Sequence, residues 1–366
     1  MRAAGSKIVA TSYRVPENRL THQEMRTRFG DEAADKIAAS SGIMERRVVS
    51  PDTCASDLAY AAAEDLLNRH SVDRSSIDLV VFASQTPDYL LPTTACLLQH
   101  RLRVPTTSAA FDINLGCSQY VYSVGVAHSM IVAGVARRAL VLTGDTVSRI
   151  IHPKDRAVVP LFGDAGTATL MEAAAEGEGF LDFEFGSDGS GAKYLVWPTS
   201  GMRSPRTAAS AAEKTDDTGA VRREDDMFMD GSAIFLFTLK TVPAVVSRLL
   251  TRNGVSVSDV DLFVFHQASE LIVKSSAKKL GIPNERLHYK LHDVGNSGGS
   301  TVGIALTDAW LAGRVQPGKL VVLAAFGVGL SWAVALVRWP QDGMLGPVCE
   351  VDFTGGPDKP ASQTAG

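Results

Sequence analysis

Short apolar segments rich in β-branched residues alternate with helical segments along the chain, and this alternation restricts the fold more than any other feature of the sequence. Residues 77–84 (IDLVVFAS), 109–114 (AAFDIN) and 139–143 (ALVLT) are typical of buried strands. Residues 56–70 and 117–136 predict helices, and the second is apolar on nearly every face, so it must be central. Alternation of this kind predicts an α/β fold with mostly parallel, buried strands.

The second half of the chain repeats these signals in the same order. Residues 260–265 (VDLFVF) resemble the first of the strands above, residues 296–313 predict a glycine-rich turn and an apolar helix, and residues 319–325 (KLVVLAA) predict the next strand. The helices that begin near residues 117 and 296 both end in Ala-Gly before a strand. The pattern suggests an internal duplication, but the sequences are so divergent that two unrelated halves would explain them equally well.

Two segments lack the periodicity of helices and strands. Residues 203–226 are polar, and we expect an exposed loop or flap there. The tail from residue 341 onward is rich in glycine and proline, and we expect it to be poorly ordered.

Composition excludes several classes of function. Hydrophobic residues make up 45% and charged residues 21% of the 366, which is ordinary for a globular enzyme. The net charge of −4 gives no attraction to nucleic acid or to an anionic membrane. No run of about 18 apolar residues predicts a membrane span, and the first residues lack the apolar stretch of a secretory signal. We therefore expect a soluble, cytoplasmic protein.

One of the four cysteines stands out by its position. Cys54, Cys96, Cys117 and Cys349 are scattered, with no CxxC pair and no histidine at metal-ligand spacing, so we expect free thiols and neither a disulfide nor a metal. Cys117 follows a strand and a glycine and opens the central helix, where unsatisfied N–H groups favour the thiolate. It is either a covalent nucleophile or a core thiol at a tight junction.

A histidine and an asparagine also follow strands or occupy turns. His266 ends the strand LFVFH, at the sheet edge where α/β proteins present functional side chains, although a structural histidine fits too. Asn296 lies in GNSGGST, where it is either functional or a turn former. His128 lies inside the apolar helix, so we expect a packed core residue.

Three other motifs match known functional patterns, but the sequence around each lacks what that function requires. Gly295–Gly299 matches the GxSxG elbow of serine hydrolases, but the last histidine, His292, precedes Ser297. Gly327-Val-Gly329 follows a strand, but SWAVALVRW after it predicts another strand rather than a dinucleotide-binding helix. The order Cys, His, Asn suits papain-like proteases, yet their local cysteine signature is missing.

Taken together, six segments resemble β-ketoacyl-acyl carrier protein synthase III. They are SGIMERR (41–47), the Cys117 strand–helix junction, DR…LFGDAGTATL (155–170), FHQAS (265–269), HDVGNSGGST (292–301) and FGVGLSWAVALVRW (326–339). The resemblance implies the thiolase fold, in which two duplicated βαβαβαββ halves form five αβαβα layers. It also implies a homodimer. The halves would be residues 1–180, with the nucleophile, and 181–340, with His and Asn, followed by a flexible tail (341–366).

The resemblance also implies a mechanism. Cys117 would take an acyl group from a thioester, with the backbone N–H groups of Cys117 and Val328 holding the oxyanion. The family usually has glycine at the position of Val328. His266 and Asn296 would stabilise the enolate that forms as a malonyl thioester loses carbon dioxide, and the enolate would attack the acyl-cysteine. No cofactor stays bound. The substrates would be acyl-coenzyme A or an acyl carrier protein thioester, and malonyl on a carrier protein or coenzyme A.

Departures from the family pattern concern the substrate tunnel. Lys36 stands where relatives that use coenzyme A carry a tryptophan that stacks on adenine, and Ser40 replaces a nearby arginine. Arg156 matches a further nucleotide-contacting arginine, and Ser269 replaces the asparagine of HQAN. Leu91, in TPDYLLP (86–92), matches the tip of a loop that reaches into the neighbour's acyl pocket. We expect an unusual or carrier-bound acyl donor, and a role in specialised rather than housekeeping metabolism.

Two other functions stay open at this stage. Cys117 could pass its acyl group to a hydroxyl, an amine or another carrier without any malonyl group, since the same trio serves both reactions. A non-catalytic partner subunit is a third reading, but a scaffold has no need of all three residues.

Overall fold

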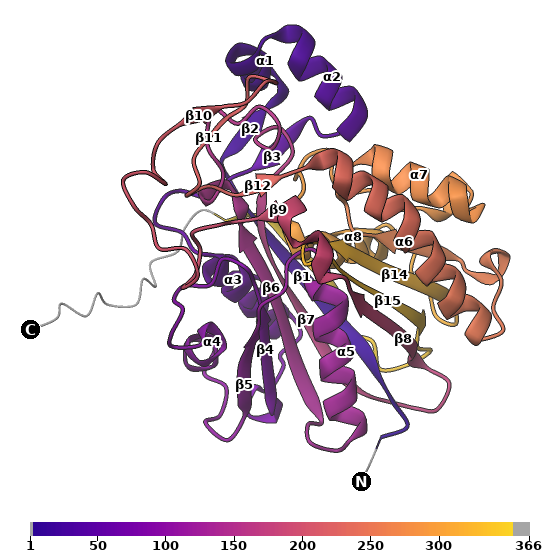
Figure 1. Cartoon of the computed structure of the whole chain (residues 1–366). Coiled ribbons are helices and arrows are strands. Elements are labelled where there is room, and N and C mark those ends of the chain that lie inside the picture. Colours follow the sequence, from indigo (N-terminus) through magenta and orange to yellow (C-terminus); the bar gives the residue numbers. More distant parts are fainter. Residues whose placement is uncertain (1–2, 354–366) are drawn as a thin grey trace, which may run out of the picture.

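The computed structural model describes residues 3–353, which form two large β-sheets, with helices between them and on both outer faces, and three two-stranded sheets (Figure 1). The first part of the chain contains β1 (Gly5–Pro16), β2 (Arg19–Thr21), α1 (His22–Phe29), α2 (Asp31–Ser41), β3 (Glu45–Arg47), α3 (Ala55–Arg69), β4 (Leu79–Ala83), α4 (Thr94–Arg101), β5 (Ala109–Ile113), α5 (Gln119–Val132), β6 (Arg138–Thr146) and β7 (Asp164–Ala174). The second part contains β8 (Gly179–Ser187), β9 (Leu195–Val196), β10 (Lys214–Thr215), β11 (Val221–Arg222), β12 (Phe228–Met229), α6 (Gly231–Arg252), β13 (Leu262–Phe265), α7 (Glu270–Leu280), α8 (Thr301–Leu311), β14 (Leu320–Gly327), β15 (Ser331–Arg338) and β16 (Gly346–Phe353).

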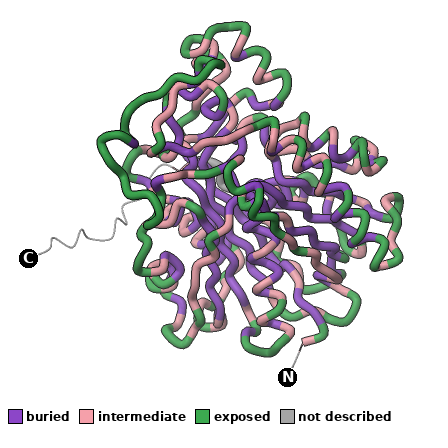
Figure 2. The backbone as a smooth tube through the Cα atoms, viewed as in Figure 1, coloured by how far each residue is buried: buried purple, intermediate pink, exposed green. Residues whose placement is uncertain are grey.

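The strands are apolar on both faces because each sheet is covered on both sides. In β14, Val321, Leu323 and Ala325 belong to the central core with α5 and α8. Their neighbours Leu320, Val322, Ala324 and Phe326 pack instead against α6 and α7. The first sheet divides its side chains between the same central core and the outer helices α3 and α4. The order is therefore helix, sheet, helix, sheet, helix, with the buried backbone at the centre of Figure 2.

The two sheets repeat one topology, which supports the predicted duplication. The first has the order β16-β1-β7-β6-β4-β5, and the second has β8-β15-β14-β13, which corresponds to β1-β7-β6-β4. The matching pairs run in the same directions: β1–β7 and β8–β15 are antiparallel, whereas β4–β6 and β13–β14 are parallel. The predicted boundary between residues 180 and 181 falls at the start of β8.

The second half is one strand shorter than the first. β5 pairs in parallel with β4, and its counterpart should pair in parallel with β13. An isolated parallel bridge between Phe263 and Leu287 occupies that place instead. The first half thus contains every strand of the predicted βαβαβαββ order. In the second half, a single bridge replaces the strand that corresponds to β5.

The expectation of a disordered tail is wrong for its first part. Residues 346–353 form β16, which pairs in parallel with β1 at the edge of the first sheet. The tail as a whole is rich in glycine and proline, but an open sheet edge beside β1 offers backbone partners that composition cannot reveal. Residues 354–366 of the predicted tail lie outside the described residues.

One helix, α6, is long and apolar enough by composition to span a membrane. Its apolar residues Val242, Val245, Val246 and Leu249 pack in the core between the second sheet and α7. The helix is therefore accounted for by packing within the fold.

Candidate active site

Cys117 lies in the turn between β5 and α5, where backbone from the second half closes over it. Its side chain is only 8% exposed. Gly327, at the end of β14, packs directly on it, because a β-carbon at residue 327 would lie 2.7 Å from Sγ. The glycine of the FGVGL segment is thus required by the closeness of β14 to the thiol.

The prediction that this thiol favours its thiolate form is wrong. Burial raises the pKa of Cys117 to about 11, and the nearby Asp145 carboxylate adds to the rise. The backbone N–H groups of Val328 and of Cys117 itself point toward Sγ and oppose the rise, but burial outweighs them. Cys117 therefore rests as a thiol at neutral pH, and its reactivity depends on a substrate that takes up the proton.

His266 follows β13 and is held as a neutral imidazole. Its side chain is 2% exposed, and burial lowers its pKa to about 3. Nδ1 lies 2.6 Å from the hydroxyl of Thr301 at the start of α8, and the ring packs edge-on against Phe326. The backbone N–H of Gln267 donates to the same hydroxyl. Because Thr301 is the partner of Nδ1, Nε2 is the ring nitrogen that remains for a substrate.

Asn296 is oriented by the glycine-rich turn that carries it. The backbone N–H of Gly298 donates to Asn296 Oδ1 at 3.1 Å, which leaves the amide N–H₂ as a free donor. The backbone of Asn296 is fixed on both sides, since its N–H donates to Leu161 and its carbonyl accepts from Gly163. Gly295 has a positive φ of 78°, and a β-carbon there would also lie 2.7 Å from Arg46 Cγ.

The structure brings the three predicted residues around one short segment, the turn at Gly298. Gly298 binds Asn296 through its N–H and Thr301 through its carbonyl, and Thr301 in turn holds His266. The same glycine lines a cavity together with Cys117. Among the described residues, no hydrogen bond links the side chains of Cys117, His266 and Asn296 directly, and the residues that line the cavity include Cys117 but neither His266 nor Asn296.

Beneath this turn lies a carboxylate that sequence reasoning missed. Asp145, at the end of β6, is 2% exposed and accepts hydrogen bonds from Gln85 N–H, Gly299 N–H, the Ser84 hydroxyl and Gln119 Nε2. Burial raises its pKa to about 7, against the effect of these donors. Asp145 thus joins the first half of the chain to the turn that carries Asn296.

The second glycine of this turn is required by close packing. A β-carbon at Gly299 would lie 2.0 Å from Cγ of Gln119, on the first turn of α5. Neither Thr301 nor Gln119 was assigned a role from sequence. The glycines of GNSGGST did predict that another part of the protein packs closely on this turn, but the sequence does not reveal which side chain does so.

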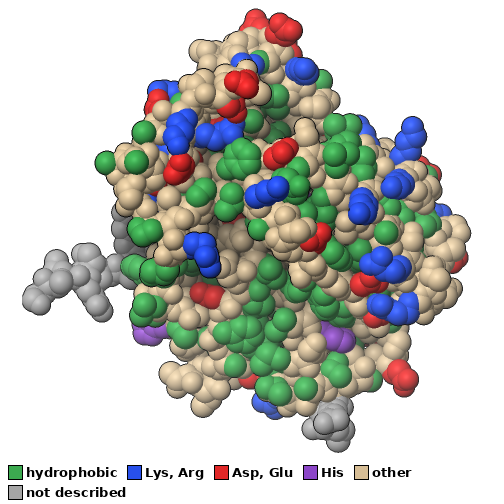
Figure 3. Space-filling view, viewed as in Figure 1, with side chains coloured by type: hydrophobic (Ala, Val, Ile, Leu, Met, Phe, Trp, Pro, Cys, Tyr) green, Lys and Arg blue, Asp and Glu red, His purple; other side chains and the backbone are tan. Residues whose placement is uncertain are grey.

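A cavity of about 770 Å³ begins at Cys117 and ends at the protein surface. One wall is apolar and includes Val147, Phe162, Leu195 and Met227, which pack in a single cluster. A second, polar wall is formed by Gln85, Thr86, Asp88, Asn114, Asp145, Thr146 and Arg149. Trp197 and Arg206 also line the cavity, with the guanidinium 5.7 Å from the indole centre. The space-filling view shows a hollow on this face (Figure 3).

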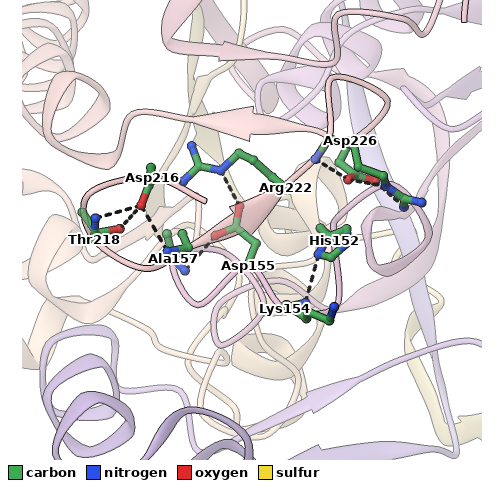
Figure 4. Close-up of polar contacts among 10 residues, drawn as sticks. His152, Lys154, Asp155, Ala157, Asp216, Thr218, Arg222 and Asp226 are labelled. Carbon is green, nitrogen blue, oxygen red and sulfur yellow. Dashed lines mark hydrogen bonds and ion pairs between the residues drawn. The ribbon is translucent and has the colours of Figure 1, made fainter. Parts of the chain in front are cut away.

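The polar segment that begins near residue 203 is exposed, as predicted, but it is fastened to the body. Arg222 of β11 donates to Asp155, a carboxylate that is 1% exposed and also accepts from the Ala157 N–H (Figure 4). Lys154 also pairs with Glu213, which directly precedes β10. These contacts hold the hairpin β10–β11 against residues 152–157, so the segment forms a fixed rim beside the cavity.

The structure spreads the remaining predicted site residues around this centre. Lys36 and Ser40 are exposed on α2, and Arg156 is half-buried against Gly219 of the hairpin. Ser269 caps α7 by accepting from Ile272 N–H. Leu91 is 85% exposed at the tip of its loop. A binding role for each of these five stays a prediction.

His128 is a packing residue, as expected. Its Nδ1 pairs with the Ser6 hydroxyl at 3.0 Å, and its ring lies among the aromatic rings of Phe180 and Phe183. Burial lowers its pKa.

Comparison with known proteins agrees with this geometry. The family described as 3-oxoacyl-[acyl-carrier-protein (ACP)] synthase III matches residues 111–189, and its C-terminal region matches residues 250–339. The β-ketoacyl-[acyl-carrier-protein] synthase III of Caldanaerobacter subterraneus subsp. tengcongensis is 34% identical, over 93% of this chain and 98% of its own.

Solved structures give the same result. A crystal structure of 3-oxoacyl-(acyl-carrier-protein) synthase III has a TM-score of 0.89 at 39% identity, over 92% of this chain and all of the other. The 3-oxoacyl-(acyl-carrier protein) synthase of Burkholderia xenovorans LB400 has a TM-score of 0.86 at 34% identity, over 96% and 98% of the two chains. With its five-layer fold and its Cys, His and Asn around one turn, the chain belongs to the β-ketoacyl-acyl carrier protein synthase III family.

Proposed function

We propose that the protein is a condensing enzyme that joins an acyl group on Cys117 to the carbanion formed from a malonyl thioester. One observation carries the proposal: Nε2 of His266 and the amide N–H₂ of Asn296 are left for a substrate, because Thr301 and Gly298 bind the other polar atoms of these side chains. Two neutral donors beside a thiol suit a reaction in which negative charge develops on a carbonyl oxygen.

In the first step, the sulfur of Cys117 attacks the carbonyl carbon of an acyl thioester. The new C–S bond forms as the old one breaks, and the thiol proton leaves with the departing thiolate. The N–H groups of Cys117 and Val328, which point toward Sγ, would bind the negative oxygen of the intermediate. Backbone donors are unaffected by the side chain of Val328, so its replacement of glycine need not disturb this role.

In the second step, the bond between the carboxylate and the α-carbon of the malonyl group breaks, and carbon dioxide leaves. The electron pair becomes an enolate, whose oxygen would accept from His266 and Asn296, and each such donor is worth about 3–4 kcal/mol. The enolate carbon then attacks the acyl-cysteine carbonyl. The C–S bond breaks, the Cys117 thiolate takes up a proton, and a β-ketoacyl thioester is released.

For the acyl donor, we propose a carrier-bound or otherwise unusual thioester, in specialised metabolism. Lys36 and Ser40 are exposed and provide no aromatic face for adenine. The missing stacking is worth about 1–3 kcal/mol in base–aromatic contacts, hence about tenfold in affinity. The hairpin at Gly219 also lies against Arg156, the remaining matched arginine. Comparing kcat/KM for Cys117 acylation by one acyl group on coenzyme A and on a carrier protein tests this, and a superior coenzyme A ester would refute it.

We further propose a homodimer in the cytoplasm. β5 is an edge strand of the first sheet, with one side unpaired in the single chain. Apolar side chains gather over α5 on the face shown in Figure 3. Large exposed hydrophobic residues in this part of the chain include Tyr89, Leu90, Leu91, Val135 and Phe185. A free thiol nucleophile suits a reducing compartment.

The test of the reaction separates its two steps. The protein is incubated with an acyl thioester, and the adduct on Cys117 is measured by intact mass and peptide mapping. Malonyl-carrier is then added, and carbon dioxide and β-ketoacyl product are counted. We expect equal amounts of both products. His266→Ala and Asn296→Ala should keep the adduct but lose carbon dioxide release. Product without carbon dioxide would establish simple acyl transfer, and an adduct on Cys54 or Cys96 would remove Cys117 from the mechanism.

A further inference from the structure

The polar wall of the cavity bears on the kind of acyl group that the enzyme carries. This inference rests on the proposed function, since it concerns the group that is bound to Cys117. An unsubstituted alkyl chain needs only the apolar wall formed by Val147, Phe162, Leu195 and Met227. The polar wall would then also face the chain, and each of its polar groups would lose water without gaining a partner.

Most polar groups of this wall are already satisfied by the protein. Asp145 accepts four hydrogen bonds. The hydroxyl of Thr86 accepts from Thr146 N–H, Asp88 accepts from Ser56, and Arg149 donates to the Thr53 carbonyl. These groups therefore build the wall and have little capacity left for a ligand, except for Oδ1 of Asp88, which is buried without a hydrogen-bond partner in the described part of the chain.

Two amide side chains of the wall are different. Gln85 and Asn114 line the cavity and are exposed, and within residues 3–353 no protein group hydrogen-bonds to the side-chain amide of either. An acyl group bound against them would therefore displace the water that reaches these amides. Gln85 lies closest to the chemistry, because its Oε1 packs against Gly116, next to the nucleophile. A β-carbon at Gly116 would lie 2.4 Å from this oxygen. An acyl group on Cys117 would thus have an unpaired amide beside its first carbons.

The charges around the cavity restrict what this amide would bind. Asp88 and Asp145 line the polar wall and disfavour a second carboxylate, whereas Arg149 and Arg206 disfavour an ammonium group. A neutral hydroxyl fits, because it both donates to and accepts from an amide. We infer that Gln85 selects an acyl group that carries a hydroxyl near its thioester carbonyl.

The experiment compares matched acyl groups on one leaving group. Butyryl, 2-hydroxybutyryl, 3-hydroxybutyryl and succinyl thioesters of N-acetylcysteamine are used, so that neither nucleotide nor carrier contacts contribute. The rate of Cys117 acylation is followed by intact mass. We expect at least one hydroxylated group to load about tenfold faster than butyryl. Gln85→Leu should abolish this preference by slowing the hydroxylated group about tenfold more than butyryl.

A matched control is Gln23→Leu, which removes an exposed amide on α1 and should keep the preference. Butyryl loading as fast as both hydroxylated groups, or succinyl loading fastest, overturns the inference while leaving the proposed function intact. A preference that survives in Gln85→Leu also overturns it. If none of the four thioesters forms an adduct on Cys117, the proposed function fails, and the inference fails with it.

Discussion

At the scale of single residues, the state of the Cys117 thiol sets how the enzyme should respond to pH. Its pKa is raised to about 11 by burial, so the thiolate fraction grows nearly tenfold for each pH unit across the neutral range. We expect the rate of Cys117 alkylation by iodoacetamide to rise with a slope near one, on a logarithmic scale, from pH 7 to pH 9. A rate that levels off below pH 8 would instead indicate a thiolate stabilised by the helix.

Thr301 should determine which nitrogen of His266 carries the proton. The hydroxyl accepts from Gln267 N–H, and its single proton has two acceptors within reach, His266 Nδ1 at 2.6 Å and the Gly298 carbonyl at 3.2 Å. Donation to Nδ1, the shorter contact, leaves Nε2–H as the donor. We expect Thr301→Val to slow malonyl decarboxylation about a hundredfold, the cost of one lost donor to a developing oxyanion. Cys117 acylation should be spared, and Thr301→Ser should restore most of the rate.

The control for this variant lies on the same helix. Thr307 is also buried, and its hydroxyl donates to the Gly303 carbonyl, away from His266. Thr307→Val should therefore leave decarboxylation within about threefold of wild type. Equal losses in the two variants would show that Thr301 acts only through stability.

The chemistry at this scale was only partly readable from the sequence. Cys117, His266 and Asn296 were identified, because each follows a strand or a glycine at a recognisable junction. The protonation state of Cys117 was not, since local position favours a thiolate and only the packing of Gly327 and the second half reveals the burial. Asp145 was missed for a related reason: its four donors come from separate segments of the chain.

At the scale of elements, the turn before α8 packs against α5 where Gly299 meets Gln119. Gly299→Ala would place a methyl group 2.0 Å from Gln119 Cγ. We expect this variant to lower the free energy of unfolding by about 1–3 kcal/mol and to slow decarboxylation more than acylation, because Asn296 lies in the same turn. Gln119→Ala in the same protein should recover much of both losses, giving a strongly non-additive pair. Denaturant unfolding and the two half-reactions measure these effects.

Gly201→Ala is the matched control, because a β-carbon at Gly201 would meet no atom within 4 Å. It should change neither stability nor rate. Additive losses in Gly299→Ala and Gln119→Ala would mean that the two residues do not compete for space.

Elements themselves were predicted well where apolar runs are long. The strands β4, β5, β6, β13 and β14 and the helices α3, α5 and α8 all lie within, or one to three residues from, the expected ranges. The strand β16 was not predicted, because pairing with β1 rather than its own composition makes it a strand. The shortened strand at Leu287 could not be predicted either, because a single bridge produces no recognisable pattern in the sequence.

At the scale of the whole molecule, Leu91 offers a test of the proposed dimer. It is 85% exposed in one chain, an unusual position for a leucine. We expect Leu91→Ala to leave the protein dimeric and to shift its preference toward longer acyl groups, because a smaller tip frees space in the neighbour's cavity. Sedimentation and acylation by a series of chain lengths check the two parts. A monomeric wild type, or an unaltered chain-length profile, would contradict the prediction.

The strand that the second half lacks has a consequence for how copies can join. β5 ends the first sheet with an open side, whereas the matching place beside β13 holds only the bridge to Leu287. Had both halves kept a full strand there, each chain would offer two like edges, and copies joined edge to edge could add one after another into a filament. Within residues 3–353 the chain has one such strand, β5, so joining through it uses the edge that each chain offers at this position, and growth at that edge stops at two.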